Sequence, residues 1–282
     1  MAANKVLNYP IAYINHTLQN APFFKPLQRG NRDIDIVIQH TYSNNDTITI
    51  YMQERLDIKD QDLLLAILSI TYIGYRGTII DTNSILFKNL KSSNNSMYAV
   101  AINTTRYELL KELGLDPKSS SSIKWLEGSL KRLKNTSFKL ITSQLNSEYT
   151  SNLISIETTK TTSKVLKIDI ALNTYLCSYF LESDILKKGI ISHNRQERVS
   201  MKKESARALH SYFNSLVNIK SSRLFHLNTL VEKIYRVEVK NINKYSKSKK
   251  RKSISDGLAE INNLKLWEID FISKDLVKII RK

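Results

Sequence analysis

The sequence repeats one pattern at a separation of 128 positions. The first copy runs from Ser119 to Ile141, and the second begins near Asn243. Each copy consists of an amphipathic helical segment, an asparagine and an alternating strand-like segment. A repeat on this scale predicts two domains of the same architecture. The aligned pairs are Leu126 with Ile254, Leu130 with Leu258, Leu133 with Ile261, Asn135 with Asn263, Phe138 with Leu266 and Ile141 with Ile269.

A shorter predicted helix precedes each copy, at Thr104–Gly114 and at about Leu227–Arg236. The order of helix, connection, amphipathic helix and β-hairpin is that of a winged helix-turn-helix. In the second copy the hairpin is predicted from the apolar segments at 267–272 and 276–280. The sequence therefore predicts an α+β protein with two tandem winged helix-turn-helix domains and β-hairpin wings.

The predicted boundaries are an N-terminal arm at 1–32, a first domain at 33–165 and a second domain at 166–282. The arm contains three of the four prolines and is expected to have little regular structure. The first domain is expected to open with a hairpin over 34–52 and a core helix over 57–74. Strands between 137 and 172 are expected to form one long wing. The second domain is expected to open with a helix around 172–181 and to contain another at 203–216, whereas 190–201 has no clear period.

A dense basic cluster lies at the start of the second amphipathic helix. With Ile254 at zero and about 100° per residue, Leu258 and Ile261 share one stripe, while Lys249 and Lys252 lie opposite. Such a helix would pack through its C-terminal half and offer a basic N-terminal half to a DNA major groove. The alternatives are a solvated lysine surface and a disordered basic loop. The candidate DNA-binding residues of this helix are Lys244, Tyr245, Ser246, Lys247, Ser248, Lys249, Lys250, Arg251 and Lys252.

The same helical geometry, measured from Leu126, identifies the outward residues of the first amphipathic helix. The candidate DNA-binding residues there are Ser120, Ser121, Lys124 and Lys131. Gly128 lies on the same side. The two helices together predict two DNA-contacting elements in one chain.

The charge of the 282-residue chain is strongly positive and uneven. The formal net charge is +17, with 43 lysines and arginines against 26 acidic residues. Residues 1–165 hold 19 basic against 14 acidic residues, and residues 166–282 hold 24 against 12. A nucleic-acid partner is the simplest explanation of such a charge, and the second domain is expected to be the main DNA-binding domain.

Other features of the sequence indicate a cytoplasmic protein. The single cysteine, Cys177, excludes an intrachain disulfide framework. The N-terminus lacks the pattern of a secretion signal, and no apolar run approaches the roughly 18 residues that a membrane span requires.

The sequence offers no catalytic or cofactor motif. It has no phosphate-binding loop of the GxxxxGK[ST] type, and its five histidines are scattered without metal-ligand spacing. His210, on a predicted amphipathic helix, is expected to be a structural residue. We therefore expect no enzymatic activity, no metal site and no cofactor.

Several segments resemble the replication initiators of the replication protein C type found on IncQ-like plasmids, within the wider class of tandem winged-helix initiators that bind iterons. The resemblance covers about 240 residues. It rests on the order of the segments, which are Ala21–Tyr42, Asp57–Ile70, Arg106–Leu133, Ala206–Tyr235 and Ser246–Ile261.

This resemblance implies a function in plasmid DNA replication. Members of the class bind double-stranded iteron repeats at the origin of replication, which opens the adjacent AT-rich DNA and admits a helicase and a primase. The resemblance also implies a second recognition helix at Ser246–Ala259. A homodimer in equilibrium with the monomer is a further expected partner.

Two other functions share some of these features. A winged-helix transcriptional repressor would bind a palindromic operator and contain a ligand pocket. A nicking enzyme would leave cleaved or end-linked DNA. The positions that DNA-bound protein occupies, and the state of the DNA strands afterwards, distinguish the three functions.

Overall fold

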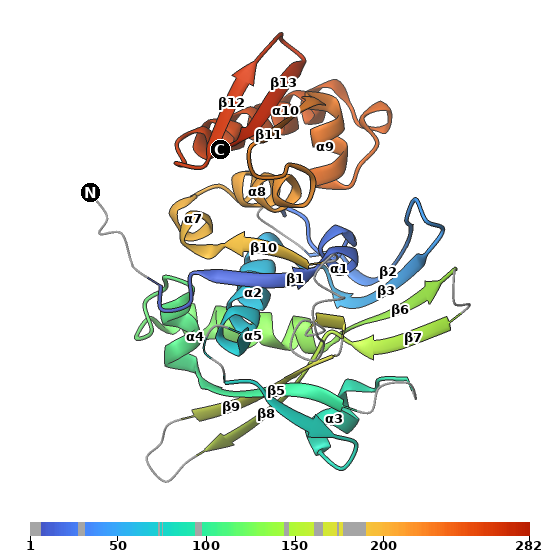
Figure 1. Cartoon of the computed structure of the whole chain (residues 1–282), viewed down its shortest axis with the longest axis vertical. Coiled ribbons are helices and arrows are strands. Elements are labelled where there is room, and N and C mark those ends of the chain that lie inside the picture. The colour runs from blue at the N-terminus through green and yellow to red at the C-terminus, as the bar shows by residue number, and fades with distance from the viewer. Residues whose placement is uncertain are drawn as a thin grey trace. The chain divides into compact units, whose positions relative to one another are not determined.

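The computed structural model describes residues 7–27, 32–72, 74, 76–93, 98–143, 147–160, 166–173, 175–176 and 190–282. The chain forms two compact units of mixed α+β structure (Figure 1). Unit 1 comprises Met1–Phe23, Gly30–Leu56 and Asp60–Arg195, and unit 2 comprises Phe24–Arg29, Asp57–Lys59 and Gln196–Lys282. Within the described part of the chain, no helix is long and apolar enough to cross a membrane.

Unit 1 contains three antiparallel sheets. Its first sheet has the strand order β2-β3-β6-β7, formed by Ile34–Thr41, Thr47–Glu54, Thr136–Thr142 and Ser147–Asn152. Its second has the order β4-β5-β9-β8, formed by Thr78–Asp81, Tyr98–Thr105, Leu166–Leu172 and Ile154–Lys160. In the third, β1 (Ile11–Asn15) pairs with β10 (Ile190–Asn194).

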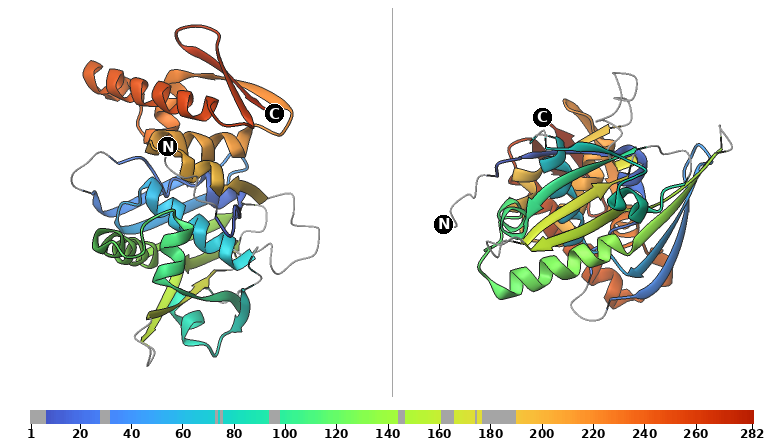
Figure 2. Two further views of the ribbon diagram at one scale, coloured as in Figure 1. Left: turned by 90° about the vertical axis from the view of Figure 1, so that its left-hand side faces the viewer. Right: turned by 90° about the horizontal axis from the view of Figure 1, so that it is seen from below.

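The longest buried helix of unit 1 is α2 (Ile58–Tyr72), whose first two residues are assigned to unit 2. The run Leu63–Leu68 is buried on every side of α2, which is typical of a helix inside a core. Among the described residues, the other helices with assigned bounds are α1 (His16–Asn20), α3 (Ile85–Leu90), α4 (Arg106–Glu112) and α5 (Ser120–Lys134). Figure 2 shows α5 along its full length.

Unit 2 has two helices, a strand, a helix, a 3-10 turn, a helix and a hairpin, in that order. Its elements are α7 (Arg195–Ser200, with Arg195 assigned to unit 1), α8 (Glu204–Leu216), β11 (Ser221–His226), α9 (Leu227–Tyr235), the 3-10 turn η2 (Val239–Asn241), α10 (Lys244–Asn262), β12 (Trp267–Phe271) and β13 (Leu276–Arg281). The three strands form an antiparallel sheet of order β11-β13-β12. The predicted hairpin after the basic helix is therefore confirmed, and it also pairs with a strand that the sequence pattern did not indicate.

A glycine allows α10 to lie close against α8. A Cβ atom at Gly257 would lie 2.9 Å from the backbone nitrogen of Ala206 and 3.0 Å from Oγ of Ser205. Ile254, Leu258 and Ile261 are buried beside this contact. The C-terminal half of α10 is thus the part that anchors the helix.

The N-terminal region differs from its prediction. Residues 1–32 were expected to form an irregular arm, yet this region contains β1 and α1. Strand β10, which pairs with β1, falls within residues 190–201, a segment whose sequence shows no clear hydrophobic period. Since each of these strands is only five residues long, neither gives a strong pattern alone, and their pairing joins segments about 180 positions apart.

The boundary predicted at 165/166 also differs from the observed division, which places residues 166–195 in unit 1. Strand β9 pairs with β5 and β8 of that unit, and β10 pairs with β1. The single long wing expected between 137 and 172 is instead two hairpins, because β6–β7 joins one sheet and β8–β9 joins another. Leu172, expected in a helix, ends β9, and most of the helix expected at 172–181 lies outside the described residues.

The buried histidine of unit 2 makes its stability dependent on pH. Nε2 of His210 lies 2.9 Å from Oε2 of Glu197, and the ring lies 5.6 Å from that of Trp267. Burial lowers the pKa of His210 below 6.5, although the bond to Glu197 acts in the opposite direction. Below pH 6.5 the unfolded state therefore binds more protons at this site than the folded state.

We expect unit 2 to lose stability as the pH falls from 6.5 towards the lowered pKa of His210, by at most about 1.4 kcal/mol per pH unit. Replacing His210 with Gln should remove this part of the slope in denaturant unfolding measured between pH 5 and 7. Burial raises the pKa of Glu204, which contributes a slope of opposite sign in both proteins. The difference between the slope of the wild type and that of His210→Gln therefore isolates the contribution of His210. Equal slopes in both proteins would exclude His210 as the source.

Candidate nucleic-acid interface

Helix α10 begins with a side-chain cap and is anchored at its far end. Oδ1 of Asn243 accepts a hydrogen bond of 2.8 Å from the backbone N–H of Ser246, which satisfies one donor of the first turn. Residues 244–253, all of which the structure describes, include no buried side chain. The basic half of α10 is therefore available for contact, and Figure 2 (left) shows its N-terminal turns projecting from unit 2.

The exposed side chains of this half follow the predicted orientation. Lys249 and Lys252 are exposed, whereas Lys250 is half-buried on the opposite side. Lys244, Tyr245 and Ser248 are also exposed, while Ser246 and Lys247 are half-buried. Tyr245 retains 78% of its accessible surface, an unusual exposure for a large aromatic residue. The exposed set forms a surface of three cations, one hydroxyl group and one phenol.

Lys250 is engaged with its own domain. Its Nζ atom lies 4.6 Å from the ring centroid of Tyr235, a cation–π contact. Partial burial lowers the pKa of Lys250, and the neighbouring positive charges of Lys25 and Lys249 add to this effect. The phenol of Tyr235 donates in turn to Oγ of Ser253 at 2.8 Å. Lys250 thus helps to hold α10 against α9.

Arg251 connects α10 to the hairpin. Its guanidinium forms an ion pair with Asp275 and donates to the carbonyl of Lys274 at 3.4 Å and to Oδ1 of Asn228 at 3.3 Å. The hydrogen bond from Arg251 also lowers the pKa of Asp275. Because Asp275 and Lys274 lie in the turn between β12 and β13, Arg251 fixes the hairpin relative to the basic helix.

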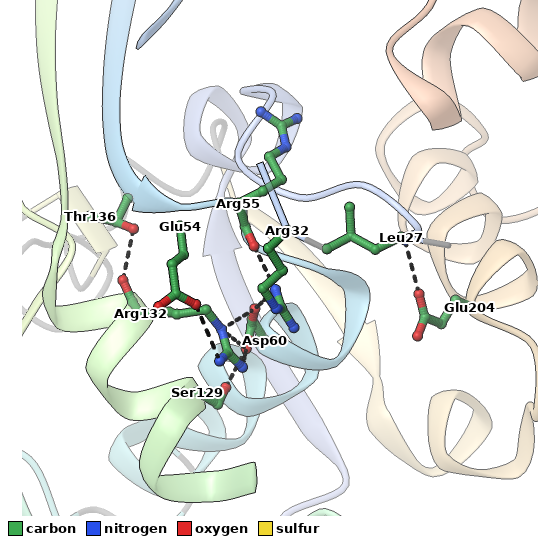
Figure 3. Close-up of polar contacts among 9 residues, drawn as sticks. All are labelled: Leu27, Arg32, Glu54, Arg55, Asp60, Ser129, Arg132, Thr136 and Glu204. Carbon is green, nitrogen blue, oxygen red and sulfur yellow. Dashed lines mark hydrogen bonds and ion pairs between the residues drawn. The ribbon is translucent and has the colours of Figure 1, made fainter. Parts of the chain in front are cut away.

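In unit 1, α5 is held by a buried acidic residue of α2. Asp60 is fully buried and accepts hydrogen bonds from Ser129 at 2.5 Å and from Arg132 at 2.8 Å, both on α5 (Figure 3). Arg32 forms a second ion pair with Asp60 at 3.2 Å. This network turns the opposite side of α5 towards solvent.

The predicted residues of α5 lie on that side. Ser120, Ser121, Lys124 and Lys131 are all exposed. Glu127, which was not among the predicted residues, is 53% exposed on the same side and forms an ion pair of 3.0 Å with Arg106. Glu127 lies about 100° from Leu126, at the edge of the outward side, so helical spacing indicates its exposure only weakly.

The exposed residues of α5 and α10 correspond at the 128-residue separation. Ser120 corresponds to Ser248, Ser121 to Lys249, and Lys124 to Lys252, and all six are exposed. The two helices thus present the same positions to solvent. Helix α10 begins four residues earlier in this register, about 6 Å of additional length that bears Lys244 and Tyr245.

Comparison with solved structures gives a match over nearly the whole chain. The crystal structure of the Pi initiator protein in complex with iteron DNA matches with a TM-score of 0.54, over 98% of this chain and 99% of that chain, at 12% sequence identity. At this identity the match shows a shared fold. No protein-family model matches the sequence. No curated protein sequence matches it either.

Proposed function

We propose that this chain is a plasmid replication initiator that binds iteron repeats at an origin of replication. The observation that carries the proposal is the exposed basic face of α10, in a fold shared along its length with an initiator that was crystallised on iteron DNA. Each unit is proposed to be a winged helix, with α5 and α10 as recognition helices. The order α8, β11, α9, α10 and the β12–β13 hairpin supports this for unit 2.

The exposed side chains suit the two tasks of a recognition helix. Lysines that reach phosphates release counterions and give affinity without sequence preference. The exposed Lys249 and Lys252 would donate to guanine O6 and N7, and Ser248 would donate or accept at a base edge. The proposed function thus requires no catalytic residue.

Two recognition helices in one chain favour a directly repeated site. Each helix would enter a successive major groove on one side of the duplex, so that one monomer reads one repeat. Bending strain from adjacent protomers would then open AT-rich DNA and admit helicase and primase. The five segments that carry the sequence resemblance favour the replication protein C type among initiators. We further propose a cytoplasmic location and a dimer in equilibrium with the monomer.

Footprinting of the intact chain on the DNA upstream of its own coding sequence tests this proposal. Direct repeats, each protected by one protomer, are the expected result. A single protected palindrome would favour the repressor. Strand breaks in end-labelled DNA would favour the nicking enzyme.

A further inference from the structure

An acidic residue on a surface that is otherwise suited to DNA needs an explanation. Ser120, Lys124, Glu127 and Lys131 follow one another at intervals of four, three and four residues along α5. At about 100° per residue they fall within about 60° of one another, on one stripe. Along the helix axis Glu127 lies between the two lysines, and around the axis it lies at the edge of the stripe, about 100° from Leu126.

The charge of Glu127 would oppose binding if it had no partner on the DNA. A carboxylate close to the duplex repels phosphates whatever the base sequence. The corresponding position of α10 is occupied by Ser255, so an acidic residue at this position belongs to α5 alone. An uncompensated carboxylate would therefore weaken unit 1 as a DNA-binding element without giving any sequence preference.

The structure holds this carboxylate in a defined place. Nη1 of Arg106, the first residue of α4, donates to Oε1 of Glu127 at 3.0 Å. This bond offsets part of the negative charge. It also leaves acceptor capacity, because a carboxylate has about four lone-pair sites.

Base edges in the major groove offer two kinds of hydrogen-bond donor to such a group. Cytosine presents its N4 amino group, and adenine presents its N6 amino group beside the N7 acceptor. An ionised carboxylate only accepts hydrogen bonds, so adenine N7 would repel its second oxygen. Cytosine N4 has an acceptor on one side only, the O6 of the paired guanine, whereas adenine N6 is flanked by its own N7 and by thymine O4, so cytosine is the better match.

We propose that Glu127 is a specificity-determining residue of α5 that accepts a hydrogen bond from the N4 amino group of one cytosine, with Arg106 as its positioning residue. This inference rests on the proposed function, because it requires α5 to enter a major groove. It assigns to unit 1 a reading of one G·C base pair, in addition to any contribution to affinity.

The test uses the intact chain and duplexes selected by the wild-type protein from a randomised pool. Each base pair of the selected site is then replaced in turn, and affinities are measured at one salt concentration. The wild type should prefer cytosine at one position by about 5- to 100-fold. Glu127→Gln should reduce that preference to less than about threefold and raise affinity for unselected duplex, since one phosphate-repelling charge is lost.

Glu148→Gln is the matched control. Glu148 lies on β7 of the same unit, is 54% exposed and forms an ion pair of 2.7 Å with Lys139, so the same charge is removed away from α5. It should leave the cytosine preference unchanged. Arg106→Gln should weaken the cytosine preference and lower the affinity for unselected duplex. Glu127→Gln should also weaken the preference, but it should raise that affinity.

The outcomes separate this inference from the proposed function. If the wild type enriches a site and every base preference of Glu127→Gln stays within about twofold of the wild-type value, Glu127 does not read a base. This conclusion holds whether or not the affinity for unselected duplex changes. If the wild type enriches no sequence at all, the proposed function itself is wrong, and the role of Glu127 with it.

Discussion

Alanine at Lys249 or Lys252 is expected to weaken binding to a selected duplex by about 5- to 100-fold and to change binding to random duplex much less. Both side chains lie on the exposed face of α10, three residues apart, so that both can enter one groove. The loss on the selected site corresponds to about 1–3 kcal/mol for a specific base contact. Titration of both duplexes at one salt concentration measures the two effects.

Lys250→Ala is the control for this experiment. It removes the same charge two residues from Lys252, but from a side chain that contacts Tyr235 and is turned away from the exposed face. We expect it to reduce binding to both duplexes by one similar, smaller factor. Equal losses of affinity on both duplexes for all three variants would mean that α10 contacts only phosphates. Sequence recognition would then have to come from α5 or the hairpins.

Removing the carboxylate of Asp60 is expected to have the largest effect on stability. Asp60→Asn removes the nearer counter-charge of the mostly buried Arg132, at 2.8 Å, and leaves it only the half-exposed Glu54 at 3.9 Å, beside the guanidinium of Arg32. Breaking a buried ion pair in this way costs about 3–5 kcal/mol. Because Ser129 and Arg132 attach α5 to Asp60, the exposed stripe of α5 should lose its fixed position together with the core of unit 1.

Hydrogen exchange resolved along the chain measures this effect, because it reports on α2 and α5 separately from unit 2. Faster exchange in α2 and α5 of Asp60→Asn is the expected result. Glu148→Gln breaks an exposed ion pair of the same unit and should change stability by less than about 1 kcal/mol. Similar protection of α5 in the wild type and in Asp60→Asn would mean that apolar packing alone holds the helix.

The elements with strong local patterns were predictable from the sequence. The hairpin β2–β3, the helices α2, α5, α8 and α10 and the final hairpin follow from alternation, helical spacing and turn residues. The pairing of β1 with β10 was not predictable, because its stability comes from contacts between distant, short segments. Strand β11 was missed for a similar reason: it has one buried residue, Phe225, and is formed by pairing with β13.

The candidate interface was predictable in orientation and less so in detail. Helical geometry placed Lys249 and Lys252 on the side that the structure exposes. It did not indicate that Arg251 binds Asp275 or that Lys250 lies over Tyr235, because these partners come from other elements of the fold. Whether these residues contact DNA stays a prediction.

The buried residues of α10, which are Ile254, Gly257, Leu258 and Ile261, all lie in its C-terminal half, and this has an evolutionary consequence. Core residues and candidate reading residues occupy separate halves of one helix. Substitutions at exposed positions away from caps and ion pairs usually change stability by no more than about 0.5 kcal/mol. The exposed positions 248, 249 and 252 can therefore diverge between lineages while the domain goes on folding. Under the proposed function, a few changes in this one helix would give related initiators mutually exclusive recognition sequences.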